Sequence, residues 1–145
     1  MSYKLPVSVL VLVHTESGEV LLLERALRPG FWQSVTGSVD HMDEPLESAA
    51  RREVMEETGI DPASGRLSPW NVVYTFEIFA QWRSRFAPGV LHNIEHVFAL
   101  QLGRRVPVRL APDEHIAYGW LPWREAAAKC FSWSNRDAIL MLGER

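Results

Sequence analysis

Residues 37–60 read GSVDHMDEPLESAARREVMEETGI and carry the strongest structural signal in the chain. The polar residues 40–44 are unsuited to burial and predict a loop, whereas the stretch from Pro45 to Thr58 predicts a helix. Proline suits the first turn of a helix, an apolar residue recurs every four positions, and Gly59 can adopt the left-handed conformation that ends helices. We therefore expect one central helix, entered from a polar loop.

Three glutamates, Glu53, Glu56 and Glu57, lie near the end of this predicted helix. Residues at i, i+3 and i+4 are neighbours on a helix surface, so the three carboxylates should gather on one face. Each like-charge pair costs an isolated helix roughly 0.2–0.5 kcal/mol, and Arg52 cannot neutralise all three. Taken alone, the pattern is typical of a solvated acidic face; the alternative is a site that holds a cation.

Strand-like segments make up most of the remaining chain. Aliphatic, β-branched and aromatic runs bounded by turn residues predict strands at 6–14, 20–24, 31–36, 70–80, 94–102 and 115–121. Two further helices are predicted at 122–129 and 134–142, and Arg83 and Arg85 should belong to an exposed basic loop. One sheet with a central helix and terminal helices indicates an α+β or mixed α/β class.

Length and composition set limits on partners. The 145 residues fit one domain spanning 1–145, and 47% hydrophobic with 23% charged residues is typical of a globular protein. A net charge of −3 gives no bulk attraction to a nucleic acid polymer or an anionic membrane, so we expect neither partner. Cys130 is the one cysteine, which suits a reducing cytoplasm. The sequence leaves the oligomeric state open.

The segment from Gly37 to Ile60 resembles the signature of the Nudix hydrolases, G-x5-E-x7-R-E-U-x-E-E-x-G-U, in which U is aliphatic. It departs from that signature at one place. Glu44 has the required seven residues before Arg52, but six residues rather than five separate it from Gly37. Asp43 fits the glycine side only, so both remain candidates for the loop carboxylate, and we take Glu44.

The resemblance implies a Nudix fold, a mixed sheet sandwiched between helices, and a pyrophosphohydrolase that needs a divalent cation. Carboxylate oxygens without clustered histidine or cysteine favour a hard cation, so we expect Mg²⁺, with Mn²⁺ able to substitute. The implied metal ligands are Glu53, Glu56, Glu57 and Glu114, and the implied catalytic residues are Arg52, Glu56, Glu57 and Glu114. Arg52 would orient the loop carboxylate, Glu114 would act as ligand or base, and Glu77 and Glu95 are its alternatives.

Motifs outside this segment resemble those of Nudix enzymes that convert 7,8-dihydroneopterin triphosphate to the monophosphate and pyrophosphate in bacterial folate synthesis. They are residues 31–39, 76–79, 85–90, 114–118 and 132–136. The implied substrate is a small pterin or nucleoside triphosphate, bound by Lys4, Arg25, Thr36, Phe76, Phe79 and Ser132. Aromatic rings stack on flat heterocycles, cationic side chains contact phosphates, and hydroxyls donate hydrogen bonds. For each ring, core packing is the competing interpretation.

Two other functions remain open. The same chemistry could act on a nucleoside triphosphate such as dATP or on a dinucleoside polyphosphate. A Nudix-fold binding module without turnover is a third possibility, although intact Arg52, Glu53, Glu56 and Glu57 argue against it. We expect His92, His96 and His115 to be structural or surface residues rather than metal ligands.

Overall fold

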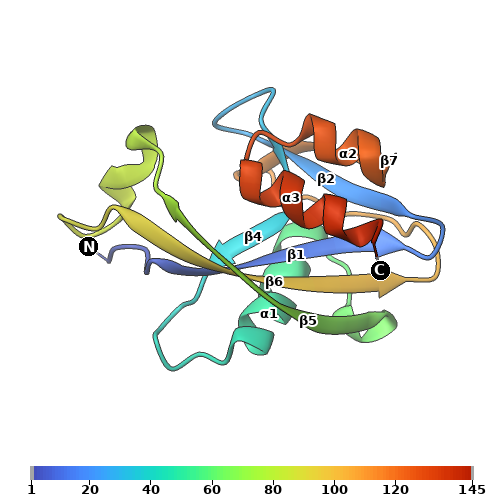
Figure 1. The fold of residues 1–145 in the computed structure, drawn as a ribbon, viewed down its shortest axis with the longest axis horizontal. Helices are drawn as coiled ribbons and strands as arrows, with labels where there is room; N and C mark the ends of the chain where they lie inside the picture. The colour runs from blue at the N-terminus through green and yellow to red at the C-terminus, as the bar shows by residue number, and fades with distance from the viewer. Residues whose placement is uncertain (1, 145) are drawn as a thin grey trace.

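The computed structural model describes residues 2–144, and within that range a seven-stranded mixed sheet lies between helices (Figure 1). The strands are β1 (Val7–Thr15), β2 (Glu19–Arg25), β3 (Trp32–Gln33), β4 (Val35–Ser38), β5 (Arg66–Glu77), β6 (His92–Leu102) and β7 (His115–Pro122). The helices are α1 (Leu46–Thr58), α2 (Trp123–Lys129) and α3 (Trp133–Leu142), with short 3₁₀ turns η1 (Pro62–Ser64) and η2 (Ala80–Arg85).

Strand β1 is the middle of the sheet. It pairs in parallel with β6 along its whole length, from Val7 to Thr15. Its other edge is shared between β4, which pairs antiparallel at residues 8–11, and β2, which pairs at the His14 end. β2 in turn pairs with β3 and β7, and β5 closes the far edge beside β6.

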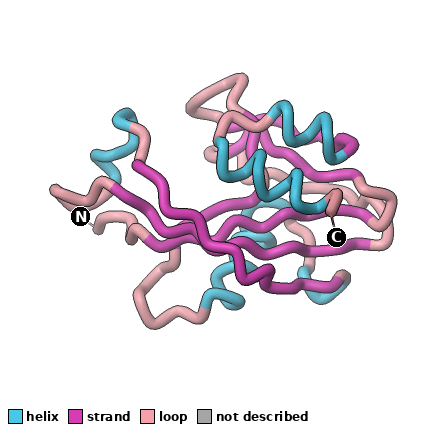
Figure 2. Tube along the Cα trace, in the orientation of Figure 1, coloured by secondary structure: helices cyan, strands magenta, loops and turns pink. Residues whose placement is uncertain are grey.

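The two faces of the sheet are covered by different helices, as the tube view in Figure 2 shows. Val9, Val11 and Val13 of β1 pack in one core cluster with α1, whereas Leu10 and Leu12 pack in a second cluster with α2 and α3. Because β1 is buried on both faces, its sequence is a continuous apolar run rather than an alternating one. The three-layer arrangement expected from the sequence is therefore present.

The expected strand 31–36 is wrong in one respect, because it is broken at Ser34 into β3 and β4. The backbone N–H of Ser34 donates to Oδ1 of Asn135 at 2.8 Å, and Nδ2 of Asn135 donates back to the Ser34 hydroxyl at 3.0 Å. An N–H bonded to a side chain cannot join a strand ladder. The break lets β3 pair with β2 and β4 pair with β1, and it ties α3 to this point.

Other boundaries differ by a few residues. β5 begins at Arg66 rather than at residue 70 and ends at Glu77 rather than at residue 80, and η2 includes Arg83 and Arg85, which were expected in a loop. Helix α1 ends where expected: Gly59 has a φ of 71° and donates its N–H to the carbonyl of Met55 at 3.0 Å. The two C-terminal helices match the prediction within one residue.

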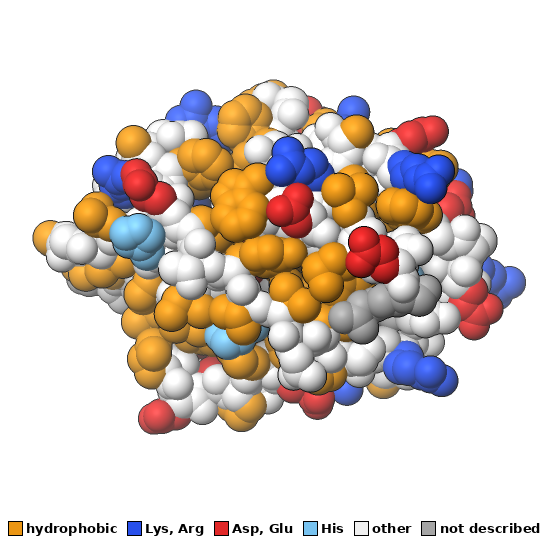
Figure 3. Space-filling model, viewed as in Figure 1, with side chains coloured by type: hydrophobic (Ala, Val, Ile, Leu, Met, Phe, Trp, Pro, Cys, Tyr) orange, Lys and Arg blue, Asp and Glu red, His pale blue; other side chains and the backbone are white. Residues whose placement is uncertain are grey.

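The surface is mixed in charge. On the face shown in Figure 3, acidic and basic side chains are interspersed around hydrophobic ones. Within residues 2–144, none of the helices has the length and apolar character needed to span a membrane.

Substitutions at two neighbouring residues of α3 test how this helix packs. Ile139 is fully buried, whereas Leu140 is 41% exposed. We expect Ile139→Ala to lower the free energy of unfolding by about 2–5 kcal/mol, because the change leaves a cavity in the core. Leu140→Ala should change it by less than about 1 kcal/mol. Urea denaturation measures both, and equal losses would show that α3 is not packed in this way.

Candidate active site

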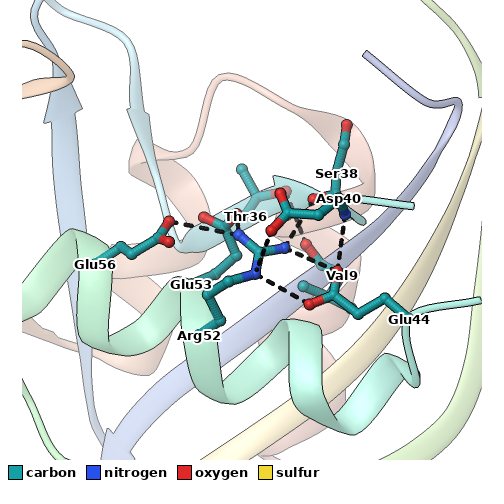
Figure 4. Close-up of polar contacts among 8 residues, drawn as sticks. All are labelled: Val9, Thr36, Ser38, Asp40, Glu44, Arg52, Glu53 and Glu56. Atoms are coloured by element: carbon teal, nitrogen blue, oxygen red, sulfur yellow. Dashed lines mark hydrogen bonds and ion pairs between the residues drawn. The ribbon is translucent and has the colours of Figure 1, made fainter.

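Arg52 joins the polar loop to helix α1. Its Nε and Nη2 donate to the two carboxylate oxygens of Glu44, each at 3.0 Å, and Nη2 also donates to the carbonyl of Ser38 at 3.2 Å (Figure 4). These hydrogen bonds hold the pKa of the Glu44 carboxyl below its usual range. Asp43 is exposed. Of the two loop carboxylates, Arg52 therefore binds Glu44, the one with the helix-side spacing.

The same guanidinium also contacts two glutamates of the helix. Nη1 of Arg52 donates to Glu53 at 2.8 Å and to Glu56 at 3.4 Å, and Asp40 adds an ion pair at 3.2 Å. A guanidinium presents its donors in a rigid fork, so one side chain can fix several carboxylates at once. Arg52 thus sets the positions of the loop and the helix relative to each other.

Glu53 and Glu57 form a buried carboxyl pair, 8% and 3% exposed. Burial raises the pKa of Glu57 well above its usual value, and the hydrogen bond and charge of Glu53 raise it further. Burial also raises the pKa of Glu53, against an opposing effect of Glu57 and Arg52. Within residues 2–144, Oε1 of Glu57 is buried without a hydrogen-bond partner. Two such groups side by side are unfavourable unless a proton or a cation lies between them.

The three helix glutamates do not gather as closely as the i, i+3, i+4 spacing suggests. The Glu56 side chain is 55% exposed and faces Arg52, whereas Glu53 and Glu57 are buried. In the described part of the chain, no three acidic, histidine or cysteine side chains are arranged as a ready metal cage. The buried pair and its unpartnered oxygen nevertheless offer the oxygen ligands that a hard divalent cation requires.

Gly37 is needed where it stands because of Glu53. A Cβ at residue 37 would lie 2.2 Å from the carboxyl carbon of Glu53, well inside van der Waals contact. The glycine of the sequence signature therefore leaves room for a carboxylate of the helix. Its role here is close approach and not backbone flexibility.

A cleft of about 390 Å³ lies beside this carboxyl pair. All six residues expected to bind substrate line it: Lys4, Arg25, Thr36, Phe76, Phe79 and Ser132. Glu57 and Glu114 line it too, whereas Glu44, Arg52, Glu53 and Glu56 are not among its lining residues. The structure thus brings the expected substrate residues together in one cavity that reaches one carboxylate of the pair.

Part of the cleft wall is cationic. Lys4 and Arg25 line it together with Arg85, and burial followed by the charge of Arg85 lowers the pKa of both. Arg25 donates from Nη1 to Gln33 at 3.1 Å and lies 4.6 Å from the ring centroid of Trp82. The charge of Glu57 acts on both Lys4 and Arg25, so this wall places positive charge beside Glu57, which is what a polyphosphate requires.

Glu114 lies in an exposed turn that also lines the cleft. Its carbonyl accepts the N–H of Ala26 at 2.9 Å, and its charge contributes to the raised pKa of Glu57. Its alternatives lie elsewhere on the cleft wall: Glu77 is exposed and pairs with Arg83 at 2.5 Å, and Glu95 is buried. Of the three, Glu114 is the one whose charge acts on Glu57.

Aromatic side chains also line the cleft, and one of them, Trp82, contacts Arg25. Phe79 and Trp133 are 40% and 45% exposed, and Phe79 packs against Trp82 and Phe131 at centroid distances of 5.2 and 5.9 Å. These rings therefore keep accessible surface, unlike core residues. The two expected hydroxyls are already engaged, since Thr36 donates to the carbonyl of Val9 at 2.9 Å and Ser132 caps α3.

His115, expected to be structural or on the surface rather than a metal ligand, is buried in the wall of the cleft. It is 4% exposed, and its Nε2 lies 4.0 Å from Oε1 of Glu57. Burial, with the nearby charge of Arg25, lowers the pKa of His115 to about 4, so the ring is neutral near neutral pH. Gln33, Asn93 and Asn135 also line the cleft and were not anticipated. Polar residues at inward positions of buried strands were the available signal.

Comparison with known proteins agrees with this geometry. The NUDIX domain model matches residues 4–142. The chain belongs to the Nudix family. It is 46% identical to the dihydroneopterin triphosphate diphosphatase of Escherichia coli K12 over 94% of this chain and 91% of that protein. It is 36% identical to the Haemophilus influenzae protein of the same name, covering 96% and 88% of the two chains.

A solved structure supports the same family assignment. The structure of the E. coli dihydroneopterin triphosphate pyrophosphohydrolase superposes with a TM-score of 0.89 at 44% identity, covering 96% of this chain and 95% of that chain. The expected Nudix fold and the expected enzyme class, a Nudix-type pyrophosphohydrolase, are confirmed. Nudix hydrolases generally need a divalent metal ion, in keeping with the oxygen ligands of the buried pair.

Gly37→Ala tests the close approach of Glu53. The added methyl has to displace the Glu53 carboxylate, so we expect loss of hydrolytic activity and a loss of about 1–3 kcal/mol in stability from overpacking. Gly103→Ala is the matched control, because a Cβ there meets nothing within 4 Å. Activity assays and urea denaturation compare the two variants. Full activity in Gly37→Ala would contradict the geometry.

Glu57→Gln tests the buried pair. The pKa of Glu57 is higher in the folded than in the unfolded state, so its contribution to stability is present at acid pH and is lost as pH rises through the folded value. In a chelator at alkaline pH, Glu57→Gln should therefore melt at a higher temperature than the wild type. Mg²⁺ should raise the Tm of the wild type and leave that of the variant unchanged.

Glu47→Gln, an exposed change on the same helix, serves as the control and should follow the wild type in both conditions. Thermal unfolding followed by circular dichroism gives each Tm. An equal Mg²⁺ shift in wild type and Glu57→Gln would show that Glu57 does not contribute to cation binding.

Proposed function

We propose that this chain hydrolyses 7,8-dihydroneopterin triphosphate to dihydroneopterin monophosphate and pyrophosphate, with Mg²⁺ as its cation and Mn²⁺ able to substitute. The observation that carries the proposal is the 46% identity over 94% of the chain to a protein named for this reaction. The cleft supports it independently, because one cavity is lined by aromatic and by cationic side chains and reaches the buried carboxylate of Glu57. A pterin triphosphate has the matching parts, a flat ring and a chain of phosphates.

Lys4, Arg25 and Arg85 would bind and orient the triphosphate. The contact of Arg25 with Gln33 and with the ring of Trp82 limits its motion, so less conformational entropy is lost on binding. Charge-assisted hydrogen bonds from guanidinium to phosphate are stronger than neutral ones. These residues would place the phosphorus atom under attack next to Glu57.

The residues that would hold Mg²⁺ are Glu53, Glu56, Glu57 and Glu114. When bound, the cation supplies positive charge that polarises the phosphate oxygens and offsets their repulsion by the carboxylates. Arg52 and Glu44 are positioning residues, because they fix the carboxylate of Glu53 next to Gly37. Glu114, exposed to water in its turn, is the alternative group to accept the proton of the attacking water.

Phe76, Phe79 and Trp133, which line the cleft, would stack on the pterin ring. Base–aromatic stacking contributes about 1–3 kcal/mol per ring and does not discriminate between heterocycles. Ser132 and Thr36 would add polar contacts along the substrate.

The proposal takes residues 1–145 as one catalytic domain with a small-molecule partner. We place it in the cytoplasm, where folate synthesis takes place and where a protein with a single cysteine suits the reducing conditions.

The aromatic side chains of the cleft also support a second class of substrate. Because stacking accepts any flat ring, a nucleoside triphosphate such as dATP would fit the same surfaces. The residues that bind the triphosphate would make the same contacts with both substrates. Selection between them has to come from groups that contact the edge of the ring.

The assay that tests the function measures pyrophosphate release from 7,8-dihydroneopterin triphosphate by purified protein with Mg²⁺. We expect turnover by the wild type, a fall of about 10²-fold or more in kcat for Glu57→Gln, and no turnover in a chelator. kcat/KM for dATP and for a dinucleoside polyphosphate, measured in parallel, ranks the substrates.

The pterin compound should have the highest kcat/KM of the three. A higher value for dATP would replace the proposed substrate while keeping the chemistry. Tight binding of the pterin compound with no release above the Glu57→Gln level would indicate a binding module.

A further inference from the structure

Gln33 of β3 joins two side chains that lie near Glu57. It is 5% exposed and lines the cleft. Its Oε1 accepts a hydrogen bond from Nη1 of Arg25 at 3.1 Å, and its Nε2 lies 3.4 Å from Nε2 of His115, within hydrogen-bond distance. One buried amide therefore contacts a phosphate-binding arginine on one side and the imidazole beside Glu57 on the other.

Arg25 decides which way the Gln33 amide points. A guanidinium has N–H donors and no acceptor, so the amide oxygen must face Arg25 and the amide NH₂ group must face His115. The NH₂ group of Gln33 therefore donates to Nε2 of His115, and that nitrogen must carry a lone pair. In a neutral imidazole, the hydrogen bond at one nitrogen decides where the proton lies, so the proton of His115 is on Nδ1.

This tautomer leaves one polar group of His115 unsatisfied. Its Nδ1 is buried and has no hydrogen-bond partner in the part of the chain that the structure describes. Buried N–H groups without a partner are rare in folded proteins, and each one calls for a reason. The reason lies in the group that Nε2, at the opposite side of the ring, faces.

Nε2 of His115 faces the unpartnered oxygen of Glu57. The two atoms are 4.0 Å apart, and Oε1 of Glu57 is buried without a hydrogen-bond partner among the described residues. Both atoms are acceptors, so no hydrogen bond forms between them. With the proton on Nε2 instead, an approach of about 1 Å would make a charge-assisted hydrogen bond to Oε1. That bond would hold the carboxylate against the ring and compete with a cation for this oxygen.

We propose that Gln33 is a positioning residue for the cation site: by donating to Nε2 of His115, it prevents the imidazole from donating to Glu57 and so leaves Oε1 of Glu57 available as a ligand. The inference rests on the proposed function for the cation at Glu57. It adds a residue that lies outside the signature segment 37–60. Gln33 acts only through His115 and takes part in no chemical step.

The position of the imidazole proton tests the first step and needs neither cation nor substrate. ¹⁵N NMR at neutral pH separates a protonated from an unprotonated ring nitrogen, and the signals of His115 are assigned through their bonds to the backbone. We expect wild-type His115 to be protonated on Nδ1. Gln33→Met keeps the length of the side chain and removes its donor, so the proton should move to Nε2. A proton on Nε2 in the wild type would overturn the proposal.

The affinity for the cation tests the consequence. Mn²⁺ serves as the probe, because electron paramagnetic resonance follows its binding directly and without turnover. We expect Gln33→Met to raise the Kd of Mn²⁺ about 10-fold, the loss produced by one competing charge-assisted hydrogen bond. Gln101→Met, the same change at an exposed position of β6, is the matched control and should keep the wild-type Kd. An unchanged Kd in Gln33→Met would contradict the inference.

The effect should disappear when His115 is replaced. In His115→Phe the ring has no proton to donate, so adding Gln33→Met should change the Kd of Mn²⁺ by less than about 2-fold. This comparison isolates the hydrogen bond to His115, because Arg25 loses its bond to Oε1 of Gln33 in both backgrounds. An equal rise in Kd in both backgrounds would show that Gln33 acts through Arg25, and the proposal would be wrong.

The outcomes separate this inference from the proposed function. If the wild type releases pyrophosphate from dihydroneopterin triphosphate but Gln33→Met binds Mn²⁺ as tightly as the wild type, the inference is wrong and the function stands. If the wild type binds Mn²⁺ about 10-fold more tightly than Gln33→Met but releases no pyrophosphate, the substrate is wrong and the inference stands. A wild type that binds no Mn²⁺ would overturn both.

Discussion

The site depends on two carboxyls, Glu53 and Glu57, held together in a buried position where their charges repel. Folding alone does not favour this arrangement, since burial and mutual repulsion both raise their pKa values. Arg52 maintains it by binding Glu53 and the loop carboxylate Glu44 with one rigid group. Strain of this kind is typical of sites whose stability is completed by a ligand. The sheet and its helices provide the rigid frame that keeps the pair from separating.

Much of the fold follows from local pattern. Helix α1 was predictable because its apolar spacing, its proline and Gly59 all agree, and the long strands are apolar runs between turns. The break at Ser34 was not, because it arises from Asn135, about one hundred residues away in the sequence. The early start of β5 was also missed, since residues 61–68 contain turn formers whose preference is overridden by pairing with β6.

The candidate site, like the fold, was predictable only in part from local sequence pattern. Residues within the signature could be named from spacing, and the loop residue became clear only when Arg52 was seen to bind Glu44 and not Asp43. The sequence did not show that His115 and Asn93 face the cleft, because their burial there depends on the tertiary structure. Proximity between β6, α3 and β5 is a property of the tertiary structure.

The N-terminal segment is bound to the rim of the cleft: the N–H of Lys4 donates to the carbonyl of Arg85 at 2.8 Å, and the Lys4 side chain lines the cavity. Anything fused ahead of this residue would emerge at the entrance. Helix α3 ends well away from that point (Figure 1). Affinity tags and immobilisation linkers therefore belong at the C-terminal end, where they leave the entrance open to diffusing substrate.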